Sequence, residues 1–246
     1  MREDLELALR CVDLTWLEPD ATPEQIRSLC AVAAHPGVDL PHVAAVCVST
    51  PFVELSSELL AGSGVRVACA TGGLPSGETS DASRRTEIAA ALDAGASEID
   101  TVIDHAGVLA GRETEVLEGL VSAREACGGA VMKVILETGA YPLLPFIRRA
   151  AELAIAAGAD IIKTSTGVGF PGATPEAVIA ITEAIAAADR PVGIKVSGGV
   201  KTAADALGYL DLVTRALGEA WRTPERFRIG ASGLVTELTN ALTDAG

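Results

Sequence analysis

Basic residues are scarce in this chain of 246 residues, and their scarcity excludes one class of partner. Lysine and arginine together number 19, against 33 aspartate and glutamate residues, so the formal net charge is −14. No basic stripe of the kind that binds nucleic acid can form from so few cations. No apolar run reaches the roughly 20 residues that a membrane-spanning helix needs. The sequence therefore predicts neither nucleic acid nor a membrane as a partner.

Metal-binding and redox motifs are also missing. The histidines His35, His42 and His105 form no HxH or HExxH pattern, so we expect no metal site. The five cysteines include no CxxC pair, which is typical of small buried hydrophobic side chains in a cytosolic protein. The segment Met1–Glu6 is acidic and lacks the apolar core of a signal peptide, so we expect a cytoplasmic location.

The sequence is rich in alternating strand-like and helix-like segments. Strands are predicted at Cys11–Leu14, Ala44–Val48, Arg66–Ala70, Glu98–Ile103, Val131–Leu136, Ile161–Lys163, Gly193–Val196 and Phe227–Gly230. Helices are predicted at Pro23–His35, Phe52–Ala61, Ser83–Ala94, Thr114–Ala126, Pro145–Ala157, Pro175–Ala188, Thr202–Leu217 and Ser232–Leu242. Capping residues, prolines and glycines stand where helix ends require them.

This alternation predicts one fold class. Several strands are continuous apolar runs, which suits a parallel sheet covered on both faces. Eight strand–helix units in about 250 residues predict a single (β/α)8 TIM barrel, an α/β fold, as one domain over residues 1–246. A short N-terminal helix, Leu5–Arg10, is expected as a lid on the bottom of the barrel. An open doubly wound sheet is the alternative, but no GxGxxG follows the first strand to support it.

Two strand-like runs that each end in a lysine form the first candidate site. Asp160–Gly167 contains Lys163, and Val192–Gly199 contains Lys195. Burial penalises a charged ammonium, which is one way to obtain a neutral amine for Schiff-base chemistry. The alternative is that each lysine is an ion-paired filler of the barrel, but two lysines on neighbouring strands favour the catalytic interpretation. Other polar residues are expected at the same face of the barrel, namely Asp13, Asp100, Asp104, Lys133 and Glu137.

Glycine clusters after three consecutive strands form the second candidate site. They are Gly167, the pair Gly198–Gly199 and the segment Gly230–Gly233. Backbone N–H groups in such loops commonly bind phosphate in barrels. Ordinary turns that need positive φ are the alternative, although three clusters together favour a phosphate site. Cys47 ends the second strand, where either a pocket-facing thiol or a core thiol is consistent with the sequence.

Taken in order, these motifs carry a resemblance to a known family. The segments are Asp13–Leu17, Pro19–Thr22, Val46–Val48, Gly73–Gly77, Glu98–Ile103, Lys133–Thr138, Ile162–Gly167, Lys195–Thr202 and Arg228–Ser232. Over essentially its whole length the chain resembles the deoxyribose-phosphate aldolases, which are class I aldolases. The resemblance implies reversible cleavage of 2-deoxy-D-ribose 5-phosphate to glyceraldehyde 3-phosphate and acetaldehyde, with no metal and no organic cofactor.

The resemblance also implies a role for each matched residue. Lys163 would form the Schiff base, Lys195 would favour its uncharged form and help proton transfer, and Asp100 would act with a water as acid and base. Gly198, Gly199 and Ser232 would bind the phosphate. Other expected substrate contacts are Asp13, Thr15, Cys47, Lys133, Thr164 and Gly167. Barrel aldolases often form dimers, which makes a homodimer a candidate assembly.

Three positions depart from the family pattern. Gly233 stands where the family often has a second serine, Val168 where some members have a lysine, and Leu74 where phenylalanine is usual. Two alternatives follow. One is a related Schiff-base lyase that acts on another or a non-phosphorylated aldehyde or sugar. The other is a non-catalytic barrel that binds a sugar phosphate.

Overall fold

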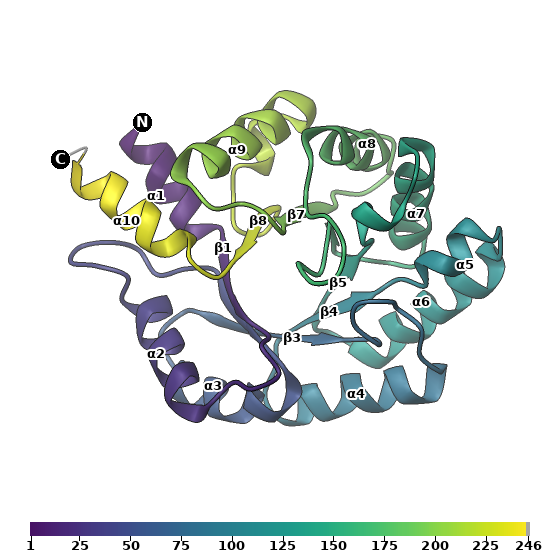
Figure 1. The fold of residues 1–246 in the computed structure, drawn as a ribbon, viewed down its shortest axis with the longest axis horizontal. Helices are drawn as coiled ribbons and strands as arrows, with labels where there is room; N and C mark the ends of the chain where they lie inside the picture. The colour runs from purple at the N-terminus through teal and green to yellow at the C-terminus, as the bar shows by residue number, and fades with distance from the viewer. Residues whose placement is uncertain (245–246) are drawn as a thin grey trace.

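The computed structural model describes residues 1–244 and shows a closed barrel of parallel strands (Figure 1). The strands are β1 (Val12–Trp16), β2 (Ala45–Val48), β3 (Arg66–Thr71), β4 (Glu98–Val102), β5 (Val131–Ile135), β6 (Ile161–Lys163), β7 (Gly193–Ser197) and β8 (Phe227–Ala231). Each strand pairs with the next, and β8 pairs with β1, so the sheet has no edge. The predicted (β/α)8 TIM barrel is confirmed, and the open sheet is wrong because β1 and β8 are hydrogen-bonded neighbours.

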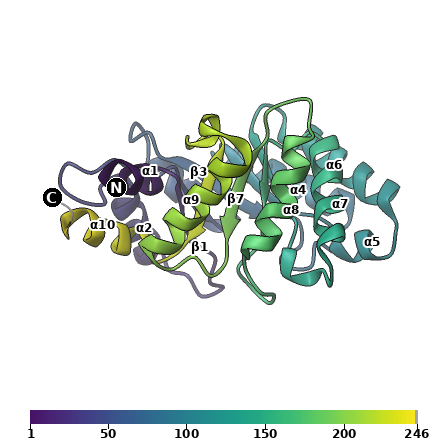
Figure 2. The same ribbon diagram turned by 90° about the horizontal axis from the view of Figure 1, so that it is seen from above.

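Helices surround this barrel as an outer ring (Figures 1 and 2). They are α1 (Arg2–Arg10), α2 (Pro23–Ala34), α3 (Val53–Leu59), α4 (Asp81–Asp93), α5 (His105–Leu109), α6 (Glu113–Cys127), α7 (Leu144–Ala156), α8 (Pro175–Ala186), α9 (Ala203–Leu217) and α10 (Leu234–Asp244). Short 3-10 turns lie at Thr50–Phe52, Thr138–Ala140 and Glu219–Trp221. Within residues 1–244, none of the helices has the length and apolar character to cross a membrane.

Local sequence explains most of the helix starts. Thr22 accepts from Gln25 N while the Gln25 side chain accepts from Thr22 N, a capping box that begins α2. Thr202 and Asp205 repeat the same arrangement at α9. Proline in the first turn starts α8, where its missing N–H costs no hydrogen bond.

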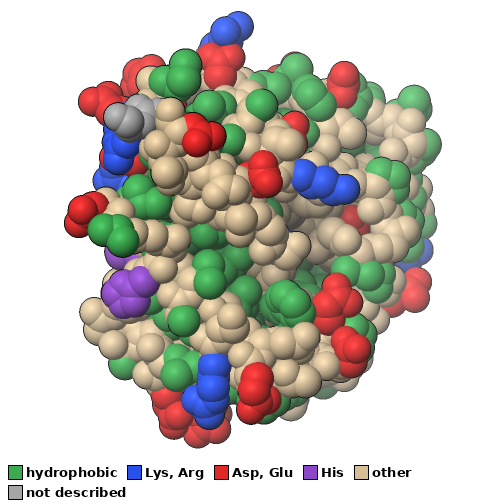
Figure 3. Space-filling view, turned by 60° about the vertical axis from the view of Figure 1, so that its left-hand side comes forward, with side chains coloured by type: hydrophobic (Ala, Val, Ile, Leu, Met, Phe, Trp, Pro, Cys, Tyr) green, Lys and Arg blue, Asp and Glu red, His purple; other side chains and the backbone are tan. Residues whose placement is uncertain are grey.

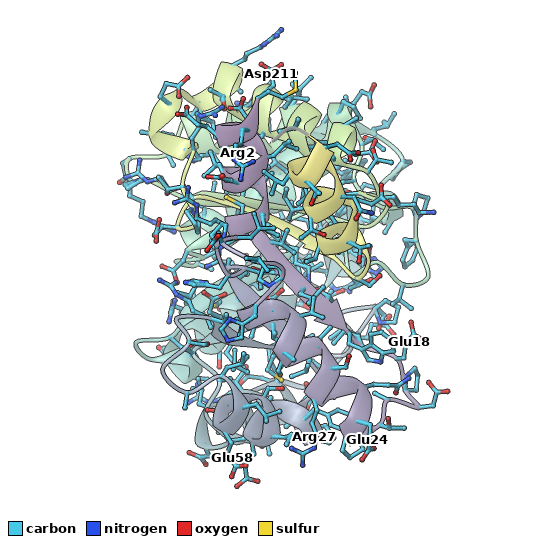
Figure 4. All side chains as sticks on the ribbon, turned by 90° about the vertical axis from the view of Figure 1, so that its left-hand side faces the viewer. Arg2, Glu18, Glu24, Arg27, Glu58 and Asp211 are labelled. Atoms are coloured by element: carbon cyan, nitrogen blue, oxygen red, sulfur yellow. The ribbon has the colours of Figure 1, made fainter. Side chains whose placement is uncertain are left out.

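The helix that precedes β1 is longer than predicted and lies elsewhere. It begins at Arg2 rather than Leu5, and it packs against α9 and α10 in the outer ring. Arg2 Nη1 donates to the Leu242 carbonyl of α10, and Figure 4 shows the two helices side by side near Arg2. The helix therefore extends the ring and does not lie across the bottom of the barrel as a lid.

Successive side chains along each strand point alternately outward, toward the helices, and inward, toward the barrel interior. Outward side chains such as Leu14, Val46, Ile99 and Ile194 are buried against the helices and belong to the main hydrophobic core. Inward side chains are largely polar or small, and the most tightly buried of them are charged. The period of two along each strand thus separates an apolar shell from a polar interior. Polar surface is plentiful too, and Figure 3 shows more carboxylate than lysine or arginine side chains on one face.

One domain over residues 1–246 stays a prediction, and residues 245–246 lie outside the described part. Within that part, every helix and strand belongs to the barrel or its ring.

Candidate active site

Seven charged side chains fill the interior of the barrel, and each is at most 2% exposed. They are Asp13 of β1, Glu98 and Asp100 of β4, Lys133 of β5, Lys163 of β6, Lys195 of β7 and Arg228 of β8. Strand register brings them together, because directly paired residues of parallel strands point to the same side. Asp100 pairs with Lys133, and Lys195 pairs with both Lys163 and Arg228. The sequence therefore correctly predicts that the two strand-end lysines meet.

Asp100 is the centre of the upper part of this cluster, which is the part that contains Lys163 and Lys195. Its Oδ2 atom accepts from Lys163 Nζ at 2.9 Å and from Lys195 Nζ at 2.8 Å, while its Oδ1 atom accepts from Lys133 Nζ at 2.8 Å. Lys195 Nζ also lies 2.5 Å from Asp13 Oδ2. Asp100 is the only carboxylate in contact with Lys163 among residues 1–244, and it shares that oxygen with Lys195.

Two cations, Lys133 and Arg228, hold the lower part of the cluster, which contains Asp13 and Glu98. Lys133 Nζ lies 2.9 Å from Asp13 Oδ2 and 2.6 Å from Glu98 Oε2. Arg228 Nη1 donates to Asp13 Oδ1 at 2.6 Å and to Glu98 Oε2 at 3.2 Å, and its Nη2 donates to Glu98 Oε1 at 2.9 Å. Every buried carboxylate oxygen in the cluster has a cationic partner, so no buried charge lacks an ion-pair partner.

The carboxylates decide which groups in the cluster are charged. Burial favours the neutral form of Asp100, but Lys133, Lys163 and Lys195 outweigh it and hold the pKa of this carboxyl well below its usual range. Burial likewise disfavours a charged Lys195, but Asp100 and Asp13 outweigh burial and raise the pKa of Lys195. The prediction that burial lowers the pKa of the strand-end lysines is therefore wrong for Lys195. It stays an ammonium, able to donate a proton or a hydrogen bond.

A pocket of about 640 Å³ opens above the cluster, and Lys163 is the one charged cluster member that lines it. Predicted residues Thr15, Gly167, Gly198, Gly199 and Ser232 also line it, together with Ser197, Gly230, Ala231 and Gly233. Lys201 lines the same pocket and is the cation nearest in sequence to the glycine pair. Two acids, Glu18 and Glu237, lie on the lining as well, and Figure 4 shows Glu18 on the loop that follows β1.

Two glycines shape the floor of this pocket. Gly198 has φ of +81°, and a Cβ there would meet the backbone of Gly172 at 2.7 Å. A Cβ at Gly230 would lie 3.0 Å from Lys195 Cε and 2.8 Å from Ser197 Cβ. Gly198 therefore permits a left-handed turn next to a neighbouring loop, and Gly230 gives the Lys195 side chain room to reach Asp100.

Four of the expected substrate contacts lie in the barrel wall or interior and not on the pocket lining. Asp13 and Lys133 belong to the ion-pair cluster inside the barrel. Cys47 Sγ lies 3.9 Å from Asp100 Oδ2, and burial raises the pKa of this thiol. Thr164 Oγ1 donates to the Ser197 carbonyl at 3.1 Å and accepts from Ser197 N at 2.9 Å, so it joins β6 to β7. Contact between these four residues and substrate stays a prediction.

Two further acids lie outside the lysine cluster. Asp104 caps α5 through Gly107 N at 2.7 Å and pairs with Arg112 at 3.4 Å. Glu137 turns toward the next loop, where its Oε2 accepts from Thr166 Oγ1 at 2.5 Å, and burial raises its pKa. Glu137 also has φ of +58°, a strained value for a residue with a side chain. Glu137 thus positions a residue of the pocket wall.

Sequence reasoning overlooked Glu98 and Arg228 as part of the site. The available signal was a single charge within an otherwise apolar strand, as in Phe227–Gly230. It also overlooked Lys201, which the pocket wall includes. Among residues 1–244, no group of three or more His, Cys, Asp or Glu side chains is arranged to hold a metal ion.

The barrel is closed, and a buried lysine of one strand lines the pocket. Barrel enzymes carry their active sites at the carboxyl ends of the strands, and this arrangement places the chain in that class. Residues 8–236 match the family model described as "DeoC/LacD family aldolase", and the chain belongs to that family. It is a carbon–carbon lyase of the aldolase type.

Similar proteins carry a consistent name. A deoxyribose-phosphate aldolase from Agrobacterium fabrum (strain C58) is 40% identical over 243 residues, which cover 98% of this chain and 92% of that protein. The deoxyribose phosphate aldolase of Aeropyrum pernix, described as tetrameric, aligns with a TM-score of 0.78 at 26% identity and covers 99% of this chain and 93% of that one. An apo-form crystal structure of a candidate deoxyribose-phosphate aldolase from Toxoplasma gondii ME49 aligns with a TM-score of 0.89 at 26% identity, over 100% and 98% of the two chains.

Proposed function

We propose that this chain catalyses the reversible cleavage of 2-deoxy-D-ribose 5-phosphate to glyceraldehyde 3-phosphate and acetaldehyde through an imine on Lys163. The observation that carries the proposal is the position of Lys163, the cluster lysine that lines the pocket and has one shared carboxylate contact. The similar protein from Agrobacterium fabrum, whose name includes this sugar phosphate, supports the choice of substrate.

The reaction divides into steps that these residues can perform. The neutral Lys163 amine adds to the substrate aldehyde carbon, and a proton passes from nitrogen to oxygen to give a carbinolamine. A further proton, delivered by an acid such as the Lys195 ammonium, lets the hydroxyl leave as water and leaves a protonated imine. The C2–C3 bond then breaks, its electron pair moves toward the iminium, and the C3 hydroxyl proton goes to a base. The resulting enamine takes a proton at C2, and water adds to release acetaldehyde and restore Lys163.

Asp100 and Lys195 are the proposed proton carriers beside this nitrogen. Asp100 is an ionised carboxylate 2.9 Å from Lys163 Nζ, which suits a base acting directly or through one water. Lys195 is an ammonium 2.8 Å from the same Asp100 oxygen, which suits an acid that delivers a proton beside Lys163.

The far end of the pocket is the proposed phosphate site. Backbone N–H groups of the Gly198–Gly199 turn and the loop before α10, with the Ser232 hydroxyl, would supply hydrogen-bond donors near a helix N-terminus. Some members of the family have a lysine at the position of Val168, which lines the pocket here and is 53% exposed. In this chain, Lys201 would supply the positive charge instead. Substitution Lys201→Ala should then raise KM for the phosphorylated sugar much more than it lowers kcat.

Reductive trapping tests the imine. Wild-type protein is incubated with acetaldehyde and cyanoborohydride, and peptide mass mapping should find an ethyl adduct on Lys163. Lys163→Leu should lose both the adduct and turnover, whereas Lys201→Ala, which removes an exposed lysine of the same pocket, should keep the Lys163 adduct. Turnover at a near-normal rate in Lys163→Leu would contradict the proposal.

A second candidate function is a related lyase that acts on a non-phosphorylated aldehyde or sugar. Val168, Gly233 and the acids Glu18 and Glu237 on the pocket lining favour it, because none of them supplies a donor or a positive charge. Comparison of kcat/KM for 2-deoxyribose and its 5-phosphate separates the two functions. A clear preference for the phosphate ester supports the first candidate, and equal values support the second.

The location and assembly are part of the same proposal. The proposed site of action is the cytoplasm, in keeping with the aldolase family to which the chain belongs. A homodimer is the proposed assembly, which light scattering at several concentrations would test.

A further inference from the structure

The charges inside the barrel do not balance when all groups are ionised. Four cations, Lys133, Lys163, Lys195 and Arg228, form ion pairs with three carboxylates, Asp13, Glu98 and Asp100. Glu137 is a fourth buried carboxyl that faces Lys163, but it is bonded to Thr166 and forms no ion pair among the described residues, and burial raises its pKa. The enclosed cluster then has a formal charge of +1, and loss of a single proton makes it neutral. Since an excess charge in a buried site is costly, the cluster as a whole favours the loss of one proton.

The contacts indicate which cation loses that proton. Arg228 cannot, because a guanidinium does not deprotonate in proteins. Lys133 contacts three carboxylates and Lys195 contacts two. Lys163 contacts one carboxylate, through an oxygen that Lys195 shares. Lys163 is therefore the lysine whose proton is held by the fewest ion pairs.

We propose that Glu98 and Arg228 are positioning residues that set the proton count of this cluster and thereby the share of Lys163 present as a free amine. The inference rests on the proposed imine chemistry. Neither residue lines the pocket, so each acts through the network, Arg228 by way of Asp13 and Glu98 by way of Lys133. Arg66 also reaches Glu98 at 3.1 Å, but it is 42% exposed and solvent screens its charge.

A purely structural role is the competing explanation. Arg228 also donates to the Pro224 carbonyl, and together with Glu98 and Asp13 it links β8, β4 and β1 across the interior. If these contacts only hold strands together, substitutions should lower thermal stability and leave the pH dependence of the chemistry where it was. The structural explanation therefore predicts no pH shift, whereas the proposal predicts a shift whose sign depends on the charge that is removed.

Charge-removing variants test this sign. Arg228→Met makes the cluster neutral while Lys163 is still protonated, so less is gained when that proton is lost. The acid limb of the pH–rate profile, where the rate of imine formation falls because the amine is protonated, should therefore move to higher pH. Glu98→Gln raises the formal charge to +2, so the limb should move to lower pH. A unit charge about one barrel diameter away, at an effective dielectric constant of about 20, shifts a titration by about one pH unit. The double variant restores the original count and should return the limb close to its wild-type position.

The assay measures the rate of ethyl adduct formation on Lys163 with acetaldehyde and cyanoborohydride between pH 5 and 10. Each variant's rate is divided by the wild-type rate at the same pH, which cancels the pH dependence of the reagent itself. Arg228→Lys, which keeps the charge, is the matched control and should keep the wild-type profile. Melting temperatures are measured alongside.

The outcomes are distinguishable. Absence of any adduct in the wild-type protein would overturn the proposed function itself. Normal wild-type trapping with the same pH profile in both single variants would overturn the inference alone. If Arg228→Met does not fold, Glu98→Gln decides the question, since a shift to lower pH supports the proposal and an unchanged or opposite shift refutes it.

Discussion

Replacement of Lys195 by methionine should separate the electrostatic role of this residue from its space-filling role. Methionine has a similar length and fills the same apolar volume, but it removes the ammonium that shares Asp100 Oδ2 with Lys163. Without that charge, Asp100 holds the Lys163 proton more firmly. The fraction of Lys163 available as a free amine near neutral pH should fall, and the acid limb of the pH–rate profile should move to higher pH.

The size of the effect follows from the geometry. The two Nζ atoms lie 2.9 and 2.8 Å from the same oxygen, so they are at most about 5.7 Å apart. At an effective dielectric constant of about 20, two unit charges at that distance repel by about 3 kcal/mol, which corresponds to about two pH units. The acid limb of the pH–rate profile should therefore move by about two pH units to higher pH, and at a pH on that limb the rate should fall by up to about 100-fold.

The assay is kcat/KM for the cleavage of 2-deoxyribose 5-phosphate between pH 5 and 10, with acetaldehyde detected by coupled reduction. Arg215→Met is the control, since Arg215 is 80% exposed on α9 and pairs with Asp211. In Figure 4, Asp211 lies well apart from Glu18, which is on the pocket lining. The control removes one positive charge without touching the cluster and should keep the wild-type profile. A folded Lys195→Met protein that loses activity equally at every pH would refute the reasoning.

Three further results are expected. Gly230→Ala should lower kcat at least tenfold, because the new Cβ meets the side chains of the neighbouring strand at 2.8 and 3.0 Å. The control is Gly208→Ala, in an exposed turn of α9 where the new Cβ has nothing within 4 Å. It should raise the free energy of unfolding by about 0.5–1 kcal/mol. Asp13, Glu98 and Asp100 have lowered pKa values in the folded protein, so the stability they contribute is present above about pH 4 and should be lost as pH falls below it in urea unfolding series; constant stability from pH 7 to 3 would contradict this. Chelators should leave aldol cleavage unchanged, and a loss of activity that zinc restores would contradict the imine mechanism.

The barrel and the meeting of its lysines were predictable because both depend on short-range signals. Helix ends are marked by residues such as Thr22 and Thr202, and eight strand–helix units leave few arrangements. Consecutive strands are then neighbours, so residues at equivalent positions, such as Lys163 and Lys195, lie side by side. α5 was not predicted, because five residues including a glycine carry too weak a helical signal.

The depth of each side chain inside the barrel was not predictable in the same way. β1 extends to Trp16, two residues past its predicted end, so Asp13 lies below the rim and contacts Lys133 and Lys195. That contact crosses the interior between strands far apart in sequence, and it adds to the larger effect of Asp100 in raising the pKa of Lys195. Arg228 escaped notice for the same reason, since its partners are on β1 and β4.

The hydroxyl of Thr164 has a consequence for how this protein can change. By bonding both the N–H and the carbonyl of Ser197, it closes the β6–β7 pair immediately after the lysines. Residues beyond this closure, from Thr166 onward and in the loop before α10, line the pocket. In the described part of the chain, the side-chain ion pairs of Lys163, Lys195 and Asp100 do not extend to them. If the proposed function holds, reactivity and substrate choice depend on different parts of the barrel. Insertions or substitutions in the loops can alter the accepted aldehyde while the nucleophile keeps its geometry, which makes these loops the natural place for directed evolution to begin.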